Sequence, residues 1–203
     1  MGVRRRRAGE ARKPAVKRRR IGRVSVKSFL LMAGIFLLAA SATRMDKLIR
    51  PAALFLDEIA PLCEEIGEEL PLILAVIQTE SGFRQDARSP RGAIGLMQVM
   101  PDTGRWMAER LDLQGYGDDK LVEREWNLII GISYMRYLRG QFPESLALAL
   151  AAYNAGPNRV RAWLDAGAWD GSPAALDDIP YAETRNYVRK ALKAYEKYRK
   201  QYV

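Results

Sequence analysis

The sequence predicts a mainly α-helical domain over residues 44–203, behind a basic N-terminal segment. Apolar residues recur at helical spacing in several segments that begin near proline and end near glycine. We find no segment with the alternating apolar and polar residues typical of a half-buried strand, and no internal repeat. The chain is 48% hydrophobic, which is enough to build the core of one domain of this length.

The charge of the chain is concentrated at its N-terminus. The net charge is +9, but residues 1–27 alone hold 12 Lys and Arg against one acid. The remaining residues hold 21 basic and 23 acidic side chains, a net charge of −2. The high isoelectric point therefore belongs to the leader, and we expect no nucleic-acid partner for the helical domain.

The cysteine and histidine contents limit the chemistry. The chain has one cysteine, Cys63, and no histidine. One cysteine cannot form an internal disulfide, and Cys63 is most simply a core residue. Serine–histidine and cysteine–histidine catalytic pairs are excluded, as is a histidine–cysteine metal cluster. We expect no metal and no cofactor, so that any chemistry comes from Asp, Glu, Tyr, Ser or Lys.

An uncharged apolar run, residues 28–42, follows the basic arm. A basic segment, an apolar run and small residues at its end are typical of an export signal. The run is shorter than the ~20 residues that span a bilayer. It predicts either a signal peptide cleaved near Ala42 or an uncleaved membrane anchor at residues 28–43. We therefore expect residues 1–43 to direct export of the domain to the cell envelope.

The sequence of the domain predicts a series of helices. Residues 45–69 form one or two amphipathic helices, and Pro71 begins a helix that ends at Glu80. Residues 82–100 are a glycine-rich loop, and a loop this long in a compact domain is usually functional. Further helices are expected at residues 101–110, 127–140, 144–153, 157–164 and 179–203, with loops at 111–120 and 169–178.

Two of these helices have distinctive sequences. Residues 144–153, ESLALALAAY, are almost entirely apolar, which predicts the central buried helix of the domain. The last helix is basic towards its C-terminus. Its inner face is expected to consist of Tyr187, Val188, Leu192, Tyr195 and Tyr198.

Glu80 stands at the end of an apolar helix. The eight residues before Gln78 are Leu, Ile, Val, Ala or Pro, and Val76 and Ile77 share a helical face with Glu80. A carboxyl group among apolar neighbours is harder to ionise, so its pKa rises. Ser81 and Gly82 end the helix and leave Glu80 at its tip. A glutamate that stays protonated near neutral pH can act as a general acid.

Four motifs follow one another in an order that is specific in combination. They are Glu80-Ser81-Gly82-Phe83, Gly95-Leu96-Met97-Gln98 with Met100-Pro101, Ala152-Tyr153-Asn154-Ala155-Gly156, and Ile179-Pro180-Tyr181 with Glu183-Thr184-Arg185 and Tyr187-Val188. Each motif alone is weak. Together they resemble the catalytic domain of the soluble-type lytic transglycosylases of family 1, lysozyme-like enzymes that cut bacterial peptidoglycan. The likeness covers about residues 51–198 and implies a lysozyme-like helical domain.

The resemblance implies a role for each motif residue. Glu80 matches the single catalytic acid/base, which cuts the bond between N-acetylmuramic acid and N-acetylglucosamine and leaves a 1,6-anhydro end. The partners implied are the glycan strands of peptidoglycan. The matching substrate-binding residues are Ser81, Met97, Gln98, Tyr153, Asn154, Tyr181 and Glu183.

Structural roles remain open for several of these residues. Tyr153 and Asn154 can cap a helix, Gln98 can hold its own loop, and Tyr181 can be a packing residue. Glu183 can be a charge at a helix N-terminus, where the helix dipole favours an acid.

Two other functions also remain open. A goose-type-like lysozyme would hydrolyse the same bond with water and would need a second carboxylate, for which Asp86, Asp102 and Glu183 are candidates. A catalytically silent wall-binding module would have no need of Glu80.

Overall fold

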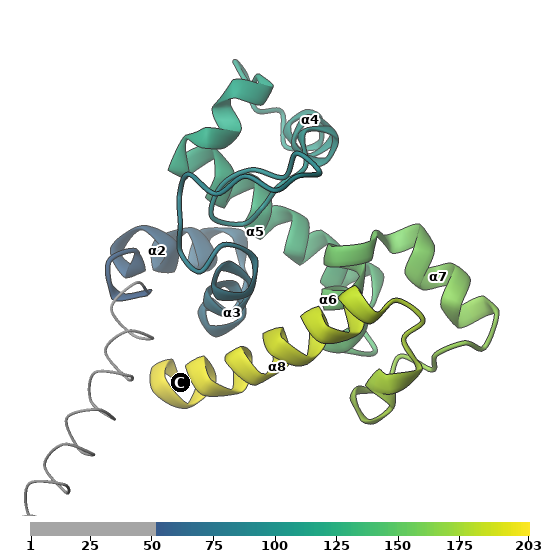
Figure 1. Cartoon of the computed structure of the whole chain (residues 1–203). Helices are drawn as coiled ribbons and strands as arrows, with labels where there is room; N and C mark the ends of the chain where they lie inside the picture. Colours follow the sequence, from purple (N-terminus) through teal and green to yellow (C-terminus); the bar gives the residue numbers. More distant parts are fainter. Residues whose placement is uncertain (1–51) are drawn as a thin grey trace, which may run out of the picture. The chain divides into compact units, whose positions relative to one another are not determined.

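The structure, a computed structural model, describes residues 52–203 (Figure 1). The predicted export segment, the expected domain boundary between residues 43 and 44, and the start of the expected helix at 45–69 lie outside the described residues. Within residues 52–203, no helix is both long enough and apolar enough to cross a membrane.

Helices are the main elements of the described part of the chain, as the sequence predicts. They are α2 (Leu56–Ile66), α3 (Leu70–Glu80), α4 (Pro101–Arg110), η1 (Asp118–Val122), α5 (Arg124–Gln141), α6 (Leu146–Ala155), α7 (Pro157–Asp165), η2 (Pro173–Asp178) and α8 (Ala182–Tyr202). Between residues 52 and 203 the only β-structure is a pair of isolated bridges, which join Ile94 to Arg88 and to Val99. The prediction of a mainly α fold is confirmed.

Some boundaries differ from the prediction. The expected loops at 111–120 and 169–178 run into the short 3₁₀ helices η1 and η2. Helix α6 begins at Leu146 rather than Glu144, because the Ser145 side chain accepts a hydrogen bond from the Ala147 N–H and caps the helix. Helix α8 begins after Tyr181, whose backbone is extended.

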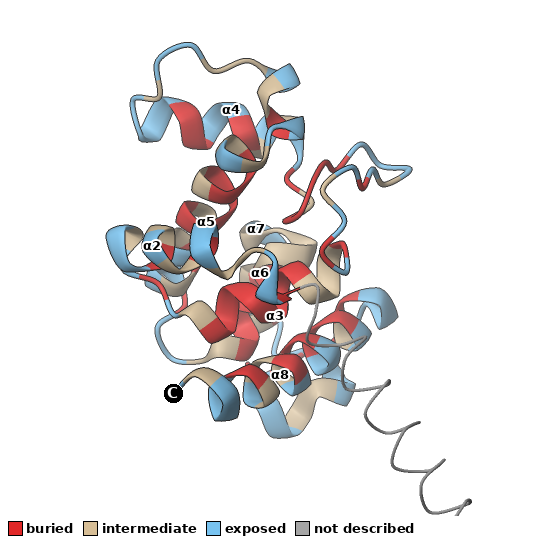
Figure 2. Cartoon of the chain, turned by 90° about the vertical axis from the view of Figure 1, so that its left-hand side faces the viewer, coloured by how far each residue is buried: buried red, intermediate tan, exposed pale blue. Residues whose placement is uncertain are grey.

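Helices α3 and α6 are buried on all sides. Residues 71–77 of α3 and 147–152 of α6 are all buried. Helix α3 packs along α8, which also contacts α6. In Figure 2, most of α3 is coloured as buried, whereas α8 has one buried and one exposed side. The prediction of a buried helix near 144–153 is confirmed, and α3 shares the core with it.

The inner face of α8 agrees with the predicted stripe in part. Tyr187, Val188 and Tyr198 are buried, and Leu192 and Tyr195 are half-buried against the core. This packing holds α3 firmly along most of its length. The last residue of α3, Glu80, is therefore carried by a rigid element.

Candidate active site

Glu80 lies in a pocket of about 380 Å³ formed by segments distant in the sequence. The lining residues come from the end of α3, the 82–100 loop, the end of α6 and the start of α8. They are Glu80, Ser89, Pro90, Arg91, Ala93, Gln98, Met100, Tyr153, Asn154 and Glu183. The structure thus brings together five of the eight residues that the sequence analysis assigned to the site.

The Glu80 carboxyl has a strongly raised pKa. This pKa is raised from 4.5 to about 7, mainly by burial and to a smaller extent by the negative charge of Glu183. The nearby Tyr187 hydroxyl opposes this shift, although it has no hydrogen-bond partner of normal length among residues 52–203. The pKa shifts in the direction that the sequence predicts, and burial is its largest cause. Near neutral pH the carboxyl is therefore present in both its protonated and its ionised form. A group that acts first as an acid and then as a base needs both forms.

The helix end that carries Glu80 is fixed by its own backbone. The Ser81 N–H donates to the Ile77 carbonyl at 3.0 Å, and the Gly82 N–H donates to the same oxygen at 3.1 Å. Gly82 has φ 61°, a left-handed conformation that favours glycine. The chain therefore turns away directly after Glu80 and leaves the carboxyl at the pocket.

Tyr153 joins α6 to the loop. Its hydroxyl donates to the Met97 carbonyl at 2.8 Å. Tyr153 lines the same pocket as Glu80. Burial and, to a smaller extent, the Glu80 charge raise the pKa of Tyr153 well above its ordinary value. The phenol therefore stays protonated and holds the loop against the end of α6.

Asn154 is oriented by α8. The Thr184 hydroxyl donates to the Asn154 Oδ1 at 2.8 Å. Because this oxygen is engaged, the amide N–H groups are the ones that Asn154 offers to the pocket. Asn154 lies within the last turn of α6, and Gly156 is the residue that caps the helix.

Gln98 combines the two roles considered for it. Its Nε2 donates to the Ala87 carbonyl at 3.1 Å and to the Gly95 carbonyl at 2.9 Å, which holds the loop together. The same residue lines the pocket. Both N–H groups are engaged, so the side-chain carbonyl oxygen is left to face a ligand.

Asn127 is a positioning residue that the sequence analysis did not single out. Its side chain, at 1% exposure, accepts from the Met97 N–H at 2.9 Å and donates to the carbonyls of Ile94 (2.9 Å) and Leu121 (3.0 Å). These bonds attach the site loop to α5. The sequence feature that could have indicated this role is an asparagine directly before the apolar run of α5.

The Met97 side chain packs closely on the backbone of α5 and supports the same attachment. A Cβ atom at Gly131 of α5 would lie 2.5 Å from the Met97 Sδ, a distance that real Cβ atoms do not show. Glycine at this position therefore lets the loop pack directly on α5.

Three predicted site residues lie outside the pocket lining. Ser81 is buried, and its hydroxyl donates to the Ile77 carbonyl at 3.2 Å. Met97 is fully buried. Tyr181 is 49% exposed and packs edge-on against Trp163, with ring centroids 5.3 Å apart. Their contact with a ligand stays a prediction.

Glu183 is the acidic residue that shares the pocket with Glu80. It forms an exposed, bidentate ion pair with Arg91 of the loop, with nitrogen–oxygen distances of 3.1 and 3.3 Å. Asp102 pairs with Arg105 instead, and Asp86 is exposed. Neither aspartate lines the pocket.

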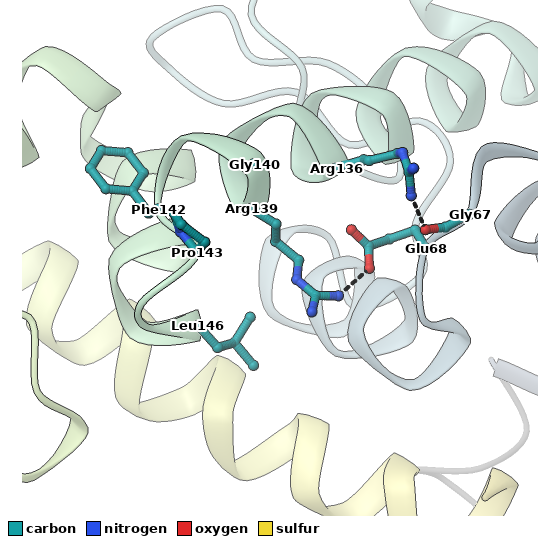
Figure 3. A pocket seen from close by; sticks show the side chains of 8 residues that line it. All are labelled: Gly67, Glu68, Arg136, Arg139, Gly140, Phe142, Pro143 and Leu146. Carbon is teal, nitrogen blue, oxygen red and sulfur yellow. Dashed lines mark hydrogen bonds and ion pairs between the residues drawn. The ribbon is translucent and has the colours of Figure 1, made fainter.

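A separate pocket of about 470 Å³ lies near the other end of α3 (Figure 3). The nearly buried Glu68 carboxylate accepts from Arg139 at 2.5 Å, and Arg136 donates to the Gly67 carbonyl. These charged groups already have protein partners and join α5 to the turn before α3. None of its lining residues belongs to the four motifs or lines the Glu80 pocket, so it is not part of the candidate active site.

The fold and this site define a lysozyme-like class of enzyme, and comparison with known proteins gives the family. The Transglycosylase SLT domain family matches residues 64–172, more than half of the chain. The chain therefore belongs to this family, and the resemblance found in the motifs is confirmed.

Named relatives and solved structures agree with the family. The chain is 41% identical over 137 residues to the soluble lytic murein transglycosylase of Escherichia coli K12, covering 65% of this chain and 21% of that protein. It is 32% identical over 165 residues to membrane-bound lytic murein transglycosylase C of Actinobacillus pleuropneumoniae, covering 71% and 45%.

Solved structures of lytic transglycosylases are also similar to this chain. One is the lytic transglycosylase Slt from Pseudomonas aeruginosa, in an inactive mutant with glutamine in place of one glutamate. It superposes on this chain with a TM-score of 0.64. Its identity is 33%, over 70% of this chain and 23% of that one. The chain thus spans about a fifth of the length of the soluble relatives that it matches.

Proposed function

We propose that the described domain is a lytic transglycosylase that cuts peptidoglycan glycan strands, with Glu80 as its acid and base. The observation that carries the proposal is a half-buried glutamate with a pKa raised to about 7, at the tip of a rigid helix in an open pocket. Family membership and the names of the relatives support it.

The proposed reaction uses one carboxyl group twice. Protonated Glu80 gives its proton to the oxygen between N-acetylmuramic acid and N-acetylglucosamine, and the bond from C1 to that oxygen breaks. The carboxylate then takes the proton from the muramoyl C6 hydroxyl while O6 bonds to C1. The products are a 1,6-anhydro end and a free N-acetylglucosamine hydroxyl, and Glu80 is protonated again. No water is consumed, so no second carboxylate is needed to activate it.

The pocket offers groups suited to an N-acetyl sugar. The Asn154 amide N–H groups can donate to the acetyl carbonyl, and the Gln98 side-chain oxygen can accept from a sugar hydroxyl or amide. The Tyr187 hydroxyl can stabilise the Glu80 carboxylate when it forms, because it opposes the raised pKa. Ser81, Met97 and Tyr181 support the site from outside its lining.

Export to the cell envelope is part of the proposal. The apolar run at residues 28–42, behind a basic arm, supports either membrane anchoring through residues 28–43 or secretion after cleavage near Ala42. Peptidoglycan lies outside the membrane, so an exported domain would meet its substrate. One relative is named as membrane-bound.

Hydrolysis of the same bond is the second candidate. Glu183 is the acidic residue with a place beside Glu80, and its carboxylate is held by Arg91. Digestion in water enriched in oxygen-18 separates the two reactions. The proposed reaction incorporates no label and leaves anhydro ends, whereas hydrolysis places the label in reducing ends. Labelled reducing ends from the wild-type protein would refute the proposal.

A further inference from the structure

The turn directly after Glu80 has a strained backbone. Gly82 and Phe83 both have left-handed conformations, with φ 61° and 65°. Glycine adopts this conformation freely, whereas a bulky residue such as phenylalanine does so only at a cost in free energy. A strained residue of this kind persists only where the surrounding structure holds it. Contacts that hold Phe83 therefore also hold the path by which the chain leaves Glu80.

The Phe83 side chain is held by the start of α2. Phe83 is 7% exposed, and its ring stacks on the ring of Phe55, with centroids 6.0 Å apart and 19° between the ring planes. Phe55 is the residue directly before α2. Helix α2 in turn contacts α3 and α5 (Figure 1). The start of α2 therefore supports a residue that lies three positions after Glu80.

Arg124, in the first turn of α5, connects this support to the loop. Its Nε and Nη2 atoms donate to the Gln85 Oε1 at 3.1 and 2.8 Å. Its Nη1 atom pairs with Glu58 of α2. Its guanidinium also lies 4.9 Å from the centroid of the Phe55 ring. One side chain thus contacts α2, the ring that supports Phe83, and the loop two residues after Phe83.

Stability from ion pairing explains only part of this arrangement. The Arg124 and Glu58 side chains are 35% and 45% exposed, and exposed ion pairs contribute little to stability. The contacts with Gln85 and Phe55 instead use the flat, forked guanidinium, a shape that lysine does not have. Arg124, Gln85 and Phe55 lie outside the four motifs and outside the lining of the Glu80 pocket. Arg124 can therefore affect the site only through the turn.

We propose that Arg124 is a positioning residue for Glu80. It fixes the strained turn through Gln85 and through the stack of Phe55 on Phe83, and so holds the carboxyl in one orientation towards the bond that is cut. The inference rests on the proposed function, because the positioned group is the proposed acid and base. A displacement of about 1 Å can lower a catalysed rate by about 10²-fold. Loosening the turn should therefore slow catalysis more than it weakens substrate binding.

The change Arg124→Lys in the full chain tests the inference. Lysine keeps the positive charge beside Glu58 but cannot donate two hydrogen bonds in a fixed fork to Gln85 or lie flat on Phe55. On soluble glycan strands we expect kcat to fall by about tenfold and KM to change by less than about twofold. An unchanged kcat, or a loss confined to KM, would overturn the inference.

Arg139→Lys is the matched control. Arg139 lies on the same helix, its side chain is 38% exposed, and it forms ion pairs with Glu68 and Glu69 in the turn before α3. It has no contact with the turn after Glu80 among the hydrogen bonds and ion pairs of residues 52–203. Arg139→Lys should leave kcat unchanged. Equal losses of kcat in the two variants would report a general weakening of α5 and would overturn the inference.

Gln85→Ala tests the route through the loop. It removes the acceptor of two Arg124 hydrogen bonds, so it should also lower kcat. Because the two residues act through one contact, the loss in the double variant with Arg124→Lys should be smaller than the product of the single losses. A loss equal to that product would overturn the shared route. If Arg124→Lys does not fold, Gln85→Ala decides, since an unchanged kcat in this variant would overturn the inference.

The titration of Glu80 gives a second readout, which needs no cleavage. A looser turn exposes the carboxyl to water, so Arg124→Lys should lower the pKa of Glu80 from about 7 towards 4.5. The other titratable groups near the carboxyl, Glu183, Tyr153 and Tyr187, are unchanged in this variant. The difference in free energy of unfolding between a chain with Glu80 and its Glu80→Gln form should therefore depend less on pH when Arg124→Lys is present.

This second readout keeps the two proposals distinguishable. The pH dependence of the difference should be reduced by Arg124→Lys and not by Arg139→Lys, and an equal effect of both changes would overturn the positioning role. Normal cleavage by the wild-type chain together with an unchanged kcat in Arg124→Lys would overturn this inference alone. A reduced pH dependence in Arg124→Lys, without any cleavage by the wild-type chain, would refute the proposed reaction and support the positioning of Glu80.

Discussion

Replacing Glu80 with glutamine is expected to stabilise the fold, and to do so more strongly as the pH rises. The pKa of the carboxyl is about 7 in the folded protein against an ordinary 4.5. The folded state therefore binds this proton more tightly than the unfolded chain. This contribution to stability is fully present below pH 4.5 and is lost as the pH rises to about 7.

The magnitude follows from the size of the shift. Each pKa unit is worth 1.36 kcal/mol, so the shift corresponds to about 3 kcal/mol. Glutamine does not titrate. The difference in free energy of unfolding between Glu80→Gln and wild type should therefore grow by about 3 kcal/mol across this window and then stay level.

Urea unfolding of both proteins over a series of pH values measures this difference. Groups that titrate alike in the two proteins contribute equally to both free energies of unfolding and cancel in the difference. The part of the difference that changes with pH therefore reports the titration of Glu80. A constant offset from the new amide does not affect the conclusion. A difference that stays constant from below pH 4.5 to above pH 7 would refute the raised pKa and the reasoning built on it.

Three other changes have expected outcomes. Asn127→Ala removes three buried hydrogen bonds and should lower the free energy of unfolding by about 3 kcal/mol in urea unfolding, at about 1 kcal/mol each. Asn127→Asp keeps the acceptor and should lose less; equal losses would contradict this account of the loop. Glu183→Gln removes a charge that raises the pKa of Glu80, so the alkaline limb of the pH–kcat/KM profile should move to lower pH; a move to higher pH would contradict this electrostatic role. Thr184→Val removes the hydrogen bond that orients Asn154, so it should lower kcat/KM with little change in melting temperature. A kcat/KM equal to that of wild type would show that this hydrogen bond does not contribute to activity.

The helices were predictable because their signals are local. Proline at the starts of α3, α4 and α7, and apolar runs in α3 and α6, determine where these helices begin and which are buried. The direction of the Glu80 pKa shift was also predictable, since the apolar residues before Glu80 indicate that its helix is buried. The starts of α6 and α8 were misplaced because they depend on the Ser145 cap and on the extended backbone of Tyr181.

The support of the site was harder to predict because it is made by contacts between distant segments. Asn127 lies 30 residues from the Met97 N–H that it binds. Thr184 lies 30 residues from Asn154. The rings of Trp106, Tyr134 and Tyr137 likewise meet only when α4 and α5 pack together. Motif residues identify the segments that meet at the site, whereas the fold determines which side chains line it.

Mass spectrometry of purified peptidoglycan digested with wild-type protein and with Glu80→Gln tests the central claim most directly. Losing the acid and base should lower the rate by about 10²-fold or more. The account predicts soluble fragments ending in 1,6-anhydro-muramic acid from the wild type and almost none from Glu80→Gln. Anhydro products released at near wild-type rates by Glu80→Gln, or reducing ends from the wild type, would contradict it.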